Sequence, residues 1–213
     1  MSIPAFRFHE CVSLVQPTGK KAADLYELRG GIGACPHGCL FHHTHQFFLK
    51  AEAVPMPYPN DFAVWADRDL HVPALAEHFA LVDPYRLPDI ETLRGVLIGI
   101  VDAYLQKYPA PRPVLPGSEF FFNDTRTIVL DTGYEAADLA SFKENLGRVN
   151  PSVLYYHFFQ ARTRLHLPSD DFSIWIEDCL GLGEIAARIR RLDPYLLTLE
   201  ELRRALLAII EKP

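Results

Sequence analysis

The 213-residue sequence has few cysteines and no long apolar run. Four cysteines are too few for the disulfide framework of a small secreted protein, so we expect reduced thiols and a cytoplasmic location. No stretch approaches the roughly 18 apolar residues that a membrane helix needs. The first residues also lack the basic and apolar segments of a signal peptide. These features predict a chain with no membrane span.

The sequence also lacks an excess of positive charge. It contains 21 Lys and Arg against 27 Asp and Glu, for a formal net charge of −6. Nucleic-acid binding depends on basic side chains that neutralise phosphates, so no nucleic-acid partner is expected. Phosphate-binding loops are missing too, since Gly30-Gly31-Ile32-Gly33 is not followed by Lys and Ser or Thr. No Gly-x-Ser-x-Gly nucleophile elbow occurs.

An internal duplication is the main feature that the sequence does contain. The segment Thr132–Leu139 repeats the pattern of Thr18–Leu25, 114 residues earlier. We predict repeat one over residues 1–107, an extended Pro-rich linker over 108–117, and repeat two over 118–213. Further matches occur in the same order: Phe6 and Phe8 with Phe120 and Phe122; Leu40, His43 and Gln46 with Leu154, His157 and Gln160; Asp61, Phe62 and Trp65 with Asp171, Phe172 and Trp175; and Asp83–Tyr85 with Asp193–Tyr195.

Each repeat is predicted to be one strand followed by about five short helices. Aromatic and β-branched residues indicate strands over 5–12 and 119–129. Because a single strand cannot satisfy its own backbone groups, we expect the two strands to pair about a pseudo-twofold axis. The predicted fold class is therefore mainly α (α+β). Later helices are expected to begin near Pro36 and Pro151, and to run over 73–82, 182–192, 90–104 and 199–210.

Several residues are predicted to start or end these helices. Thr18 and Thr132 are the expected N-caps of the first helix in each repeat, with Glu135 completing a capping box. Gly30 and Gly31 are expected to end the first helix. Three further caps are predicted: Asn60, Asp170, and Thr198 with Glu201 in a capping box.

The repeated pattern Thr-Gly-x-x-Ala-x-x-Leu, an aromatic segment with His43 or His157, Asp-Phe-x-x-Trp and Asp-Pro-Tyr resembles a prokaryotic family, the domain of unknown function 5752, in two tandem copies. The resemblance covers nearly the whole chain. It implies a bacterial or archaeal intracellular protein, and it brings no activity, cofactor or catalytic residue.

The densest group of chemically active side chains lies between Cys35 and His45. Thiolate and imidazole groups are the ligands that zinc prefers, so Cys35, Cys39, His42 and His45 are candidate ligands for zinc or another transition metal. A partner from elsewhere, such as His9 or Asp61, could complete a set with Cys35, Cys39 and His42. The alternative is a helix start in which the cysteines pack as small apolar residues and the histidines are partly exposed.

Two His–Asp pairs, His43 with Asp61 and His157 with Asp171, occur at matching places in the repeats. A carboxylate beside an imidazole fixes the tautomer, as in general-base sites, but the same pair also joins helices. Its presence in both repeats favours the structural interpretation. Trp65 and Trp175 are expected in the core rather than at a stacking site.

The sequence favours a non-enzymatic interaction or regulatory module that binds a protein partner or a second copy of itself. A metal-dependent enzyme or metal-binding protein, centred on the Cys/His cluster of repeat one, is the alternative. A small-molecule sensor with its ligand in the groove between repeats is a third hypothesis.

Overall fold

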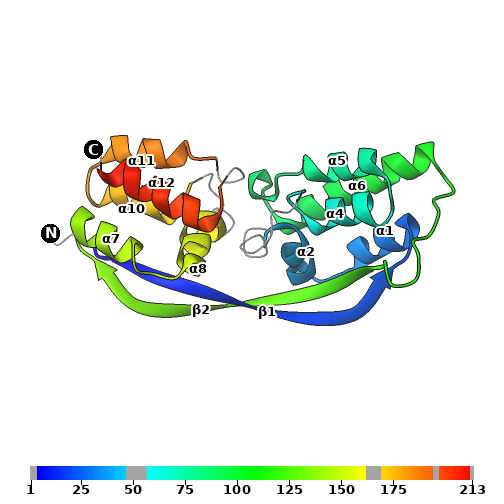
Figure 1. The fold of residues 1–213 in the computed structure, drawn as a ribbon, viewed down its shortest axis with the longest axis horizontal. Coiled ribbons are helices and arrows are strands. Elements are labelled where there is room, and N and C mark those ends of the chain that lie inside the picture. The colour runs from blue at the N-terminus through cyan, green and yellow to red at the C-terminus, as the bar shows by residue number, and fades with distance from the viewer. Residues whose placement is uncertain (1–3, 47–56, 162–168, 194–196, 212–213) are drawn as a thin grey trace. The chain divides into compact units, whose positions relative to one another are not determined.

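The chain folds into helices that pack on a two-stranded sheet (Figure 1). The structure, a computed structural model, describes residues 4–46, 57–161, 169–193 and 197–211. Within these ranges the sheet contains two antiparallel strands, β1 (Phe6–Ala22) and β2 (Phe120–Ala136). Helices account for most of the remaining described residues. The predicted class, mainly α with a small sheet, and the pairing of the two strands are therefore confirmed.

Two series of helices follow the strands. After β1 come α1 (Leu25–Ala34), α2 (His37–Thr44), α4 (Asp61–Arg68), α5 (Pro73–Ala80), the 3₁₀ helix η1 (Pro84–Arg86) and α6 (Ile90–Lys107). After β2 come α7 (Leu139–Leu146), α8 (Pro151–Leu154), the π-helical turn η2 (Tyr155–Gln160), α10 (Asp171–Asp178), α11 (Gly183–Arg190) and α12 (Leu199–Glu211). Pro194 and Tyr195 of the second Asp-Pro-Tyr motif lie outside the described residues.

Both strands are longer than the sequence predicts. Each contains 17 residues, and the predicted ranges 5–12 and 119–129 cover only part of them. The burial pattern is the same along the two strands, with the first, third, sixth and last residues buried. Each strand therefore presents its leading aromatic pair, Phe6 with Phe8 or Phe120 with Phe122, to a hydrophobic core.

The prediction that Thr18 and Thr132 cap helices is wrong, because both lie inside the strands. The Thr18 hydroxyl donates a hydrogen bond to the carbonyl of Phe122 at 2.6 Å, and the Thr132 hydroxyl donates to the carbonyl of Phe8 at 2.5 Å. The glycine after each threonine has a φ of 75° or 74°, in the region that favours glycine. Each threonine thus links one strand to the other where the backbone leaves regular strand geometry.

The first helix of each series is capped by an aspartate. Asp24 accepts a hydrogen bond from the backbone N–H of Glu27 at the start of α1. Asp138 forms a capping box with Ser141 at the start of α7, in place of the predicted box that includes Glu135. The predicted caps of the later helices are confirmed: Asn60 for α4, Asp170 for α10, and the reciprocal hydrogen bonds between Thr198 and Glu201 before α12.

Two glycines of the first helical series lie close to β2. The helix α1 continues through Gly30 and Gly31 to Ala34, so the prediction that these glycines end it is wrong. A Cβ atom at Gly31 would overlap the ring of Phe122, and one at Gly38 would overlap the carboxylate of Asp124. Both glycines are therefore used for close packing of helix against strand.

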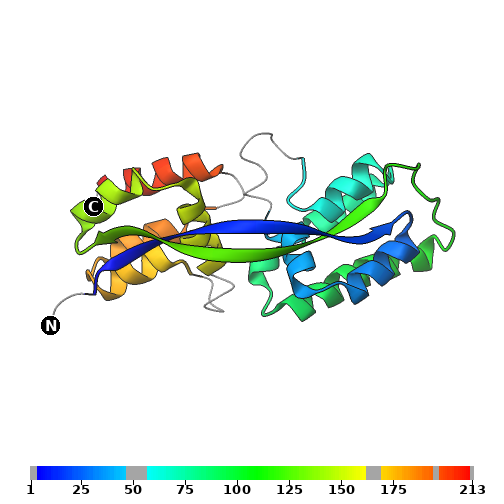
Figure 2. The same cartoon turned by 90° about the horizontal axis from the view of Figure 1, so that it is seen from below.

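The chain divides into two compact units, and each contains parts of both strands. Unit 1 consists of residues 1–12 and 127–213, and unit 2 consists of residues 13–126. Unit 1 therefore combines the start of β1 and the end of β2 with the helices from α7 to α12. Unit 2 combines the end of β1 and the start of β2 with the helices from α1 to α6. In each unit taken by itself, the helices lie on one side of the strands (Figure 1), and the view from below shows the strands in front of them (Figure 2).

The cores of the units are built around aromatic residues from the strands. In unit 1, the ring of Phe6 contacts Phe142, Phe172 and Trp175 at centroid distances of 5.3 to 5.6 Å. In unit 2, Phe120 stacks on Phe62 at 4.9 Å and contacts Trp65 at 5.9 Å. Each strand therefore contributes to a core made mostly of helices from the other half of the chain. None of the helices in the described part of the chain is long and apolar enough to cross a membrane.

Candidate functional site

His43 and Asp61 form the centre of the candidate site in unit 2. His43 comes from α2 and Asp61 from the first turn of α4, and the structure brings them together with 2.7 Å between Nδ1 and Oδ2. The backbone N–H of Asn123, on β2, donates to Nε2 of the same ring at 3.0 Å. A backbone amide can only donate, so Nε2 is the unprotonated nitrogen and Nδ1 carries the proton. The imidazole is thus neutral and donates to the Asp61 carboxylate.

His157 and Asp171 form an equivalent group in unit 1. Their Nδ1 and Oδ2 atoms are 2.7 Å apart, and the backbone N–H of His9, on β1, donates to Nε2 at 2.8 Å. Both imidazoles are nearly completely buried, with 4% of His43 and 3% of His157 exposed. Each histidine therefore connects a helical carboxylate to the backbone of a strand. Use of either ring as a general base would require the strand amide to give up its hydrogen bond.

The tryptophan four residues after each aspartate makes a further contact with the same segment. Trp65 donates from its indole N–H to the carbonyl of Ser118 at 2.8 Å, just before β2. Trp175 donates to the carbonyl of Pro4 at 2.8 Å, just before β1. The Asp-Phe-x-x-Trp motif thus holds a strand at two points, through the histidine and through the indole. Both indoles are buried, as the sequence led us to expect.

The predicted thiol ligands are close to each other, next to the guanidinium group of Arg94. Cys35 and Cys39 are buried, with 4% and 0% exposed. A hydrogen bond from Cys39 and the positive charge of Arg94, 3.7 Å away, lower the pKa of the Cys35 thiol. The same pairing and burial raise the pKa of the Cys39 thiol. One thiol of the pair is therefore more acidic than the other.

The two predicted histidine ligands point to different partners. His42 Nδ1 is 2.9 Å from Oε1 of Gln46. His45 stacks on Phe41 with 4.6 Å between ring centroids, and its Nδ1 is 2.9 Å from the hydroxyl of Thr44. Burial lowers the pKa of His45 to about 3. His45 is therefore an uncharged core residue near neutral pH.

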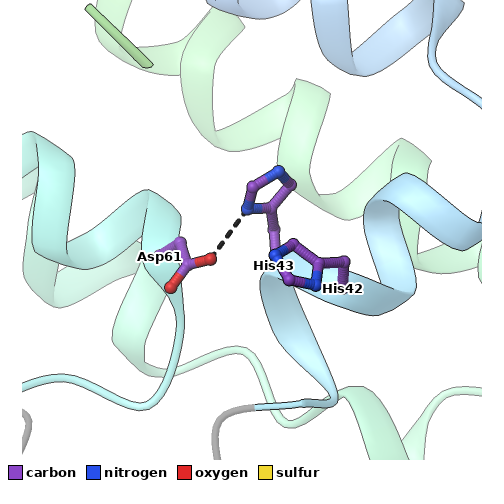
Figure 3. A group of neighbouring side chains, drawn as sticks. All are labelled: His42, His43 and Asp61. Carbon is purple, nitrogen blue, oxygen red and sulfur yellow. Dashed lines mark hydrogen bonds and ion pairs between the residues drawn. The ribbon is translucent and has the colours of Figure 1, made fainter. Parts of the chain in front are cut away.

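Among the described residues, one group of three has the composition and spacing of a metal site. The ligand atoms of His42, His43 and Asp61 lie within 4.8 Å of one another (Figure 3). The cysteines and His45 are not part of this described group, and His9 belongs to unit 1. The position that matches His42 in the second half holds Tyr156, so this arrangement belongs to the first half alone.

A pocket of about 340 Å³ opens beside the His43–Asp61 pair. Its lining includes Trp65 and Arg68 of α4, Glu119 just before β2, and the first residues of β2. A second pocket, of about 540 Å³, lies between the end of α4, the end of α6 and residues 110–118. No binding role was predicted for the residues of this second pocket. Several of them belong to the Pro-rich segment, which was predicted to be only a linker.

The backbone donors were also missed. Asn123 and His9 act through main-chain N–H groups, which have no signature in the sequence. The one available signal was spacing: His9 and Asn123 lie 114 residues apart in the sequence, as do His43 and His157.

Comparison with known proteins identifies relatives without a described activity. The profile of a family described as "Family of unknown function (DUF5752)" matches residues 3–211. The structure of OrfY from Thermoproteus tenax is similar, with a TM-score of 0.80 and 27% sequence identity over 99% of this chain and 96% of that chain. A search of curated proteins finds no match.

Proposed function

The chain belongs to the family of unknown function DUF5752, and we propose that it is a non-enzymatic interaction module that binds an extended segment of a partner protein along strand β2. The observation that carries this proposal is a run of exposed aliphatic side chains on β2. Ile128, Val129 and Leu130 are 43%, 44% and 43% exposed. Neighbouring residues of a strand point to opposite faces, so both faces of β2 are open to solvent at this point. Exposed apolar surface of this kind is typical of an interaction site.

The scaffold that presents β2 is proposed to be two tandem repeats, over residues 1–107 and 118–213, that exchange their strands about a pseudo-twofold axis. Support comes from contacts that recur 114 residues apart. His43 and His157 each bind an aspartate and a strand amide, and Thr18 and Thr132 each bind a strand carbonyl. The strand of each proposed repeat packs on the helices of the other, which would make the two repeats interdependent.

The His–Asp pairs favour a structural interpretation over a catalytic one. Both ring nitrogens of His43 and of His157 take part in hydrogen bonds that hold a strand. Chemistry at either ring would therefore compete with the packing of the scaffold. The same arrangement occurs in each unit. This is expected of a group that stabilises the fold, whereas one chain seldom needs two identical catalytic pairs.

The open edge of β2 suits a partner strand better than the open edge of β1. In the described two-stranded sheet, each strand has one paired edge and one edge that no described strand covers. Pro17 lies in β1 and has no N–H to donate, whereas Asp131 occupies the matching position of β2. Asp131 also adds a negative charge near the end of β2, where Glu135 is already paired with Arg7 at 3.0 Å. We therefore expect the partner segment to be extended and apolar, with basic residues, and to add to β2 through main-chain hydrogen bonds.

A library of displayed ten-residue peptides tests this proposal. Peptides that alternate apolar and basic residues should be enriched, and they should shift the amide NMR signals of residues 127–136. The double variant Ile128→Lys/Leu130→Lys should lose this binding, whereas Leu81→Lys, on an 84% exposed leucine at the end of α5, should keep it. Failure to enrich any peptide, or signal changes confined to other residues, would reject the β2 site. A dimer in light scattering that the double variant abolishes would assign the surface to a second copy and contradict a separate partner.

A metal-binding role is the second candidate, favoured by the cluster of His42, His43 and Asp61, and it would require His43 to exchange one of its two hydrogen bonds for the metal. Zinc or another transition metal suits imidazole and carboxylate ligands. The Cys35, Cys39, His42 and His45 set remains a separate prediction, since the described cluster contains only one of these residues. Metal analysis of tag-free protein, with Asp61→Asn compared against Asp171→Asn, distinguishes the two sets. Stoichiometric zinc that only Asp61→Asn removes would support the His42–His43–Asp61 cluster.

We place the protein in the cytoplasm. Each of its four cysteines is a free thiol in the described structure, which suits a reducing compartment.

A further inference from the structure

The larger pocket of unit 2 has the dimensions of a small-molecule site. Its volume is about 540 Å³, within the range of roughly 300–1,000 Å³ that is usual for ligand pockets. One wall is the turn between α4 and α5, from Arg68 to Val72. A second wall is the end of α6 with Tyr104 and Tyr108, and the third is the Pro-rich segment that includes Arg112.

The Pro-rich wall is fixed in place by hydrogen bonds to the rest of unit 2. The backbone N–H of Val114 donates to the carbonyl of Ala23 at 2.7 Å. The hydroxyl of Tyr26 donates to the carbonyl of Pro109 at 2.7 Å, and the carbonyl of Ser118 accepts from the indole of Trp65. Prolines further restrict the backbone between these points. The segment predicted as a connector is thus a preformed side of the pocket, which lowers the cost of ordering it around a ligand.

The polar side chains of the pocket are mostly cationic or aromatic. Arg68 and Arg112 line it from different segments, and Arg68 pairs at 3.1 Å with Asp69, whose carboxylate also belongs to the lining. Within the described residues, Arg112 has no hydrogen-bond or ion-pair partner, so its guanidinium is available to a ligand. Tyr104 and Tyr108 also line the pocket, with 4.9 Å between their ring centroids and the ammonium of Lys107 over the Tyr108 ring at 5.2 Å.

His71, on the rim of the pocket, has a left-handed backbone conformation. Its φ is 57°, and it is the only described non-glycine residue with a positive φ. The turn between α10 and α11 in unit 1 has Gly181 at the matching position, with a φ of 70°. Glycine adopts this conformation without the steric cost that a side chain meets. The first half of the chain therefore places an exposed histidine in the lining of the same pocket as Arg68 and Arg112, at a position where glycine would be less strained.

From this arrangement we propose that the pocket binds a small phosphate ester that contains a ring, with Arg68, Arg112 and His71 around the phosphate and the tyrosines against the ring. Guanidinium groups suit phosphate because they present several N–H donors in a plane. Aromatic faces suit both the sugar of a sugar phosphate and the base of a nucleotide. The site lies in unit 2 and is independent of the β2 surface.

Calorimetry with three probes tests this site: inorganic phosphate, glucose 6-phosphate and adenosine monophosphate. At least one of the two esters should bind at least ten-fold more tightly than inorganic phosphate. Neutral glucose and adenosine should bind at least ten-fold more weakly than their esters, and the preferred ester identifies the ring. If no ester binds at millimolar concentration, or if the neutral compound binds as well as its ester, the proposal fails.

Variants of the lining residues test whether the ester binds in this pocket. Arg112→Gln and Arg68→Gln should each weaken the ester at least ten-fold, while Arg126→Gln, on an exposed arginine of the same unit outside the pocket, should leave its affinity unchanged. His71→Gly should weaken binding and raise the melting temperature, because it relieves the backbone. Unchanged affinity in both Arg112→Gln and His71→Gly would overturn the site. Arg68, His71 and Arg112 all lie outside β2, and Arg126, on β2, serves only as the control, so failure of the pocket variants leaves the peptide experiment unaffected.

Discussion

The Nε2 atom of His43 accepts a hydrogen bond from the backbone N–H of Asn123, a residue 80 positions away in the sequence. Its Nδ1–H meanwhile donates to Asp61. One buried side chain therefore joins α2, α4 and β2. His157 performs the same task in unit 1 with Asp171 and the N–H of His9. The stability of each unit should depend on its own histidine group.

Replacing the aspartate should weaken one unit at a time. Asp61→Asn removes the charge that accepts the His43 proton, and Asp171→Asn does the same for His157. A hydrogen bond to a charged group contributes about 1.5–3 kcal/mol, so each variant should lose about that much stability in its unit. Each unit contains one tryptophan whose indole N–H binds a carbonyl near a strand. Hydrogen exchange of the two indole N–H groups therefore reports on the units separately.

Asp61→Asn should speed the exchange of the Trp65 indole more than that of Trp175, and Asp171→Asn should do the reverse. The two variants are controls for each other because they make the same chemical change. Equal effects on both indoles in both variants would contradict a local role for the histidine groups.

Two adjacent glycines of α1 should respond oppositely to alanine. Gly31→Ala would push a Cβ atom into the ring of Phe122, which is 1% exposed and fixed in the core. Overpacking of this kind costs about 1–3 kcal/mol. Gly30→Ala meets no atom within 4 Å and should stabilise the helix by about 0.5–1 kcal/mol. Urea unfolding of the two variants measures both effects, and a stabilised Gly31→Ala would show that α1 does not approach β2 as described.

His45 should make stability fall in mild acid. Burial lowers its pKa to about 3, and the pKa of an unfolded histidine is about 6.5. Between these two values the unfolded chain binds more protons than the folded chain. Stability therefore decreases as the pH falls from about 6.5 towards 3, with a slope of at most about 1.4 kcal/mol per pH unit from this residue.

His45→Phe should remove this contribution, and phenylalanine already occupies the matching position as Phe159. The comparison rests on the slope of unfolding free energy against pH, because the variant also loses the contact with the Thr44 hydroxyl. Identical slopes for the two proteins between pH 6.5 and 4 would show that His45 is not kept neutral by burial.

The thiols should ionise in a fixed order. The Cys39 hydrogen bond and Arg94 lower the pKa of Cys35, whereas burial raises the pKa of Cys11 to about 12. On titration from neutral to moderately alkaline pH, Cys35→Ser should show less thiolate absorbance near 240 nm than the native protein. Cys11→Ser should match the native protein over that range. The opposite ranking would reject the assigned environments.

The helices could be predicted because apolar periodicity and caps such as Asn60 are local signals, and the pairing of the strands could be predicted because a single strand cannot satisfy its own backbone groups. The sequence was insufficient for the length of the strands. Pro17, Gly19 and the lysines that follow have weak strand propensity, and the continuation of β1 depends on contacts such as that between Thr18 and the carbonyl of Phe122. A threonine six positions before the observed N-cap of each first helix was therefore mistaken for the cap.

The candidate site could be predicted only in its side chains. His43 and Asp61 were paired from their recurrence in the second half, but the donor to Nε2 is a backbone group that any residue would supply. The left-handed conformation of His71 was equally hidden, since only the glycine at the matching position pointed to it. Long-range main-chain contacts of this kind require the fold.

The most direct measurement of the central claim is the tautomer and hydrogen bonding of the two histidines by ¹⁵N NMR near neutral pH. We expect His43 and His157 as neutral Nδ1–H tautomers, with scalar coupling across the hydrogen bonds from the Asn123 and His9 amides to Nε2. A protonated Nε2 in either ring, or rapid solvent exchange of those two amides in the folded protein, would show that the histidines do not hold the strands.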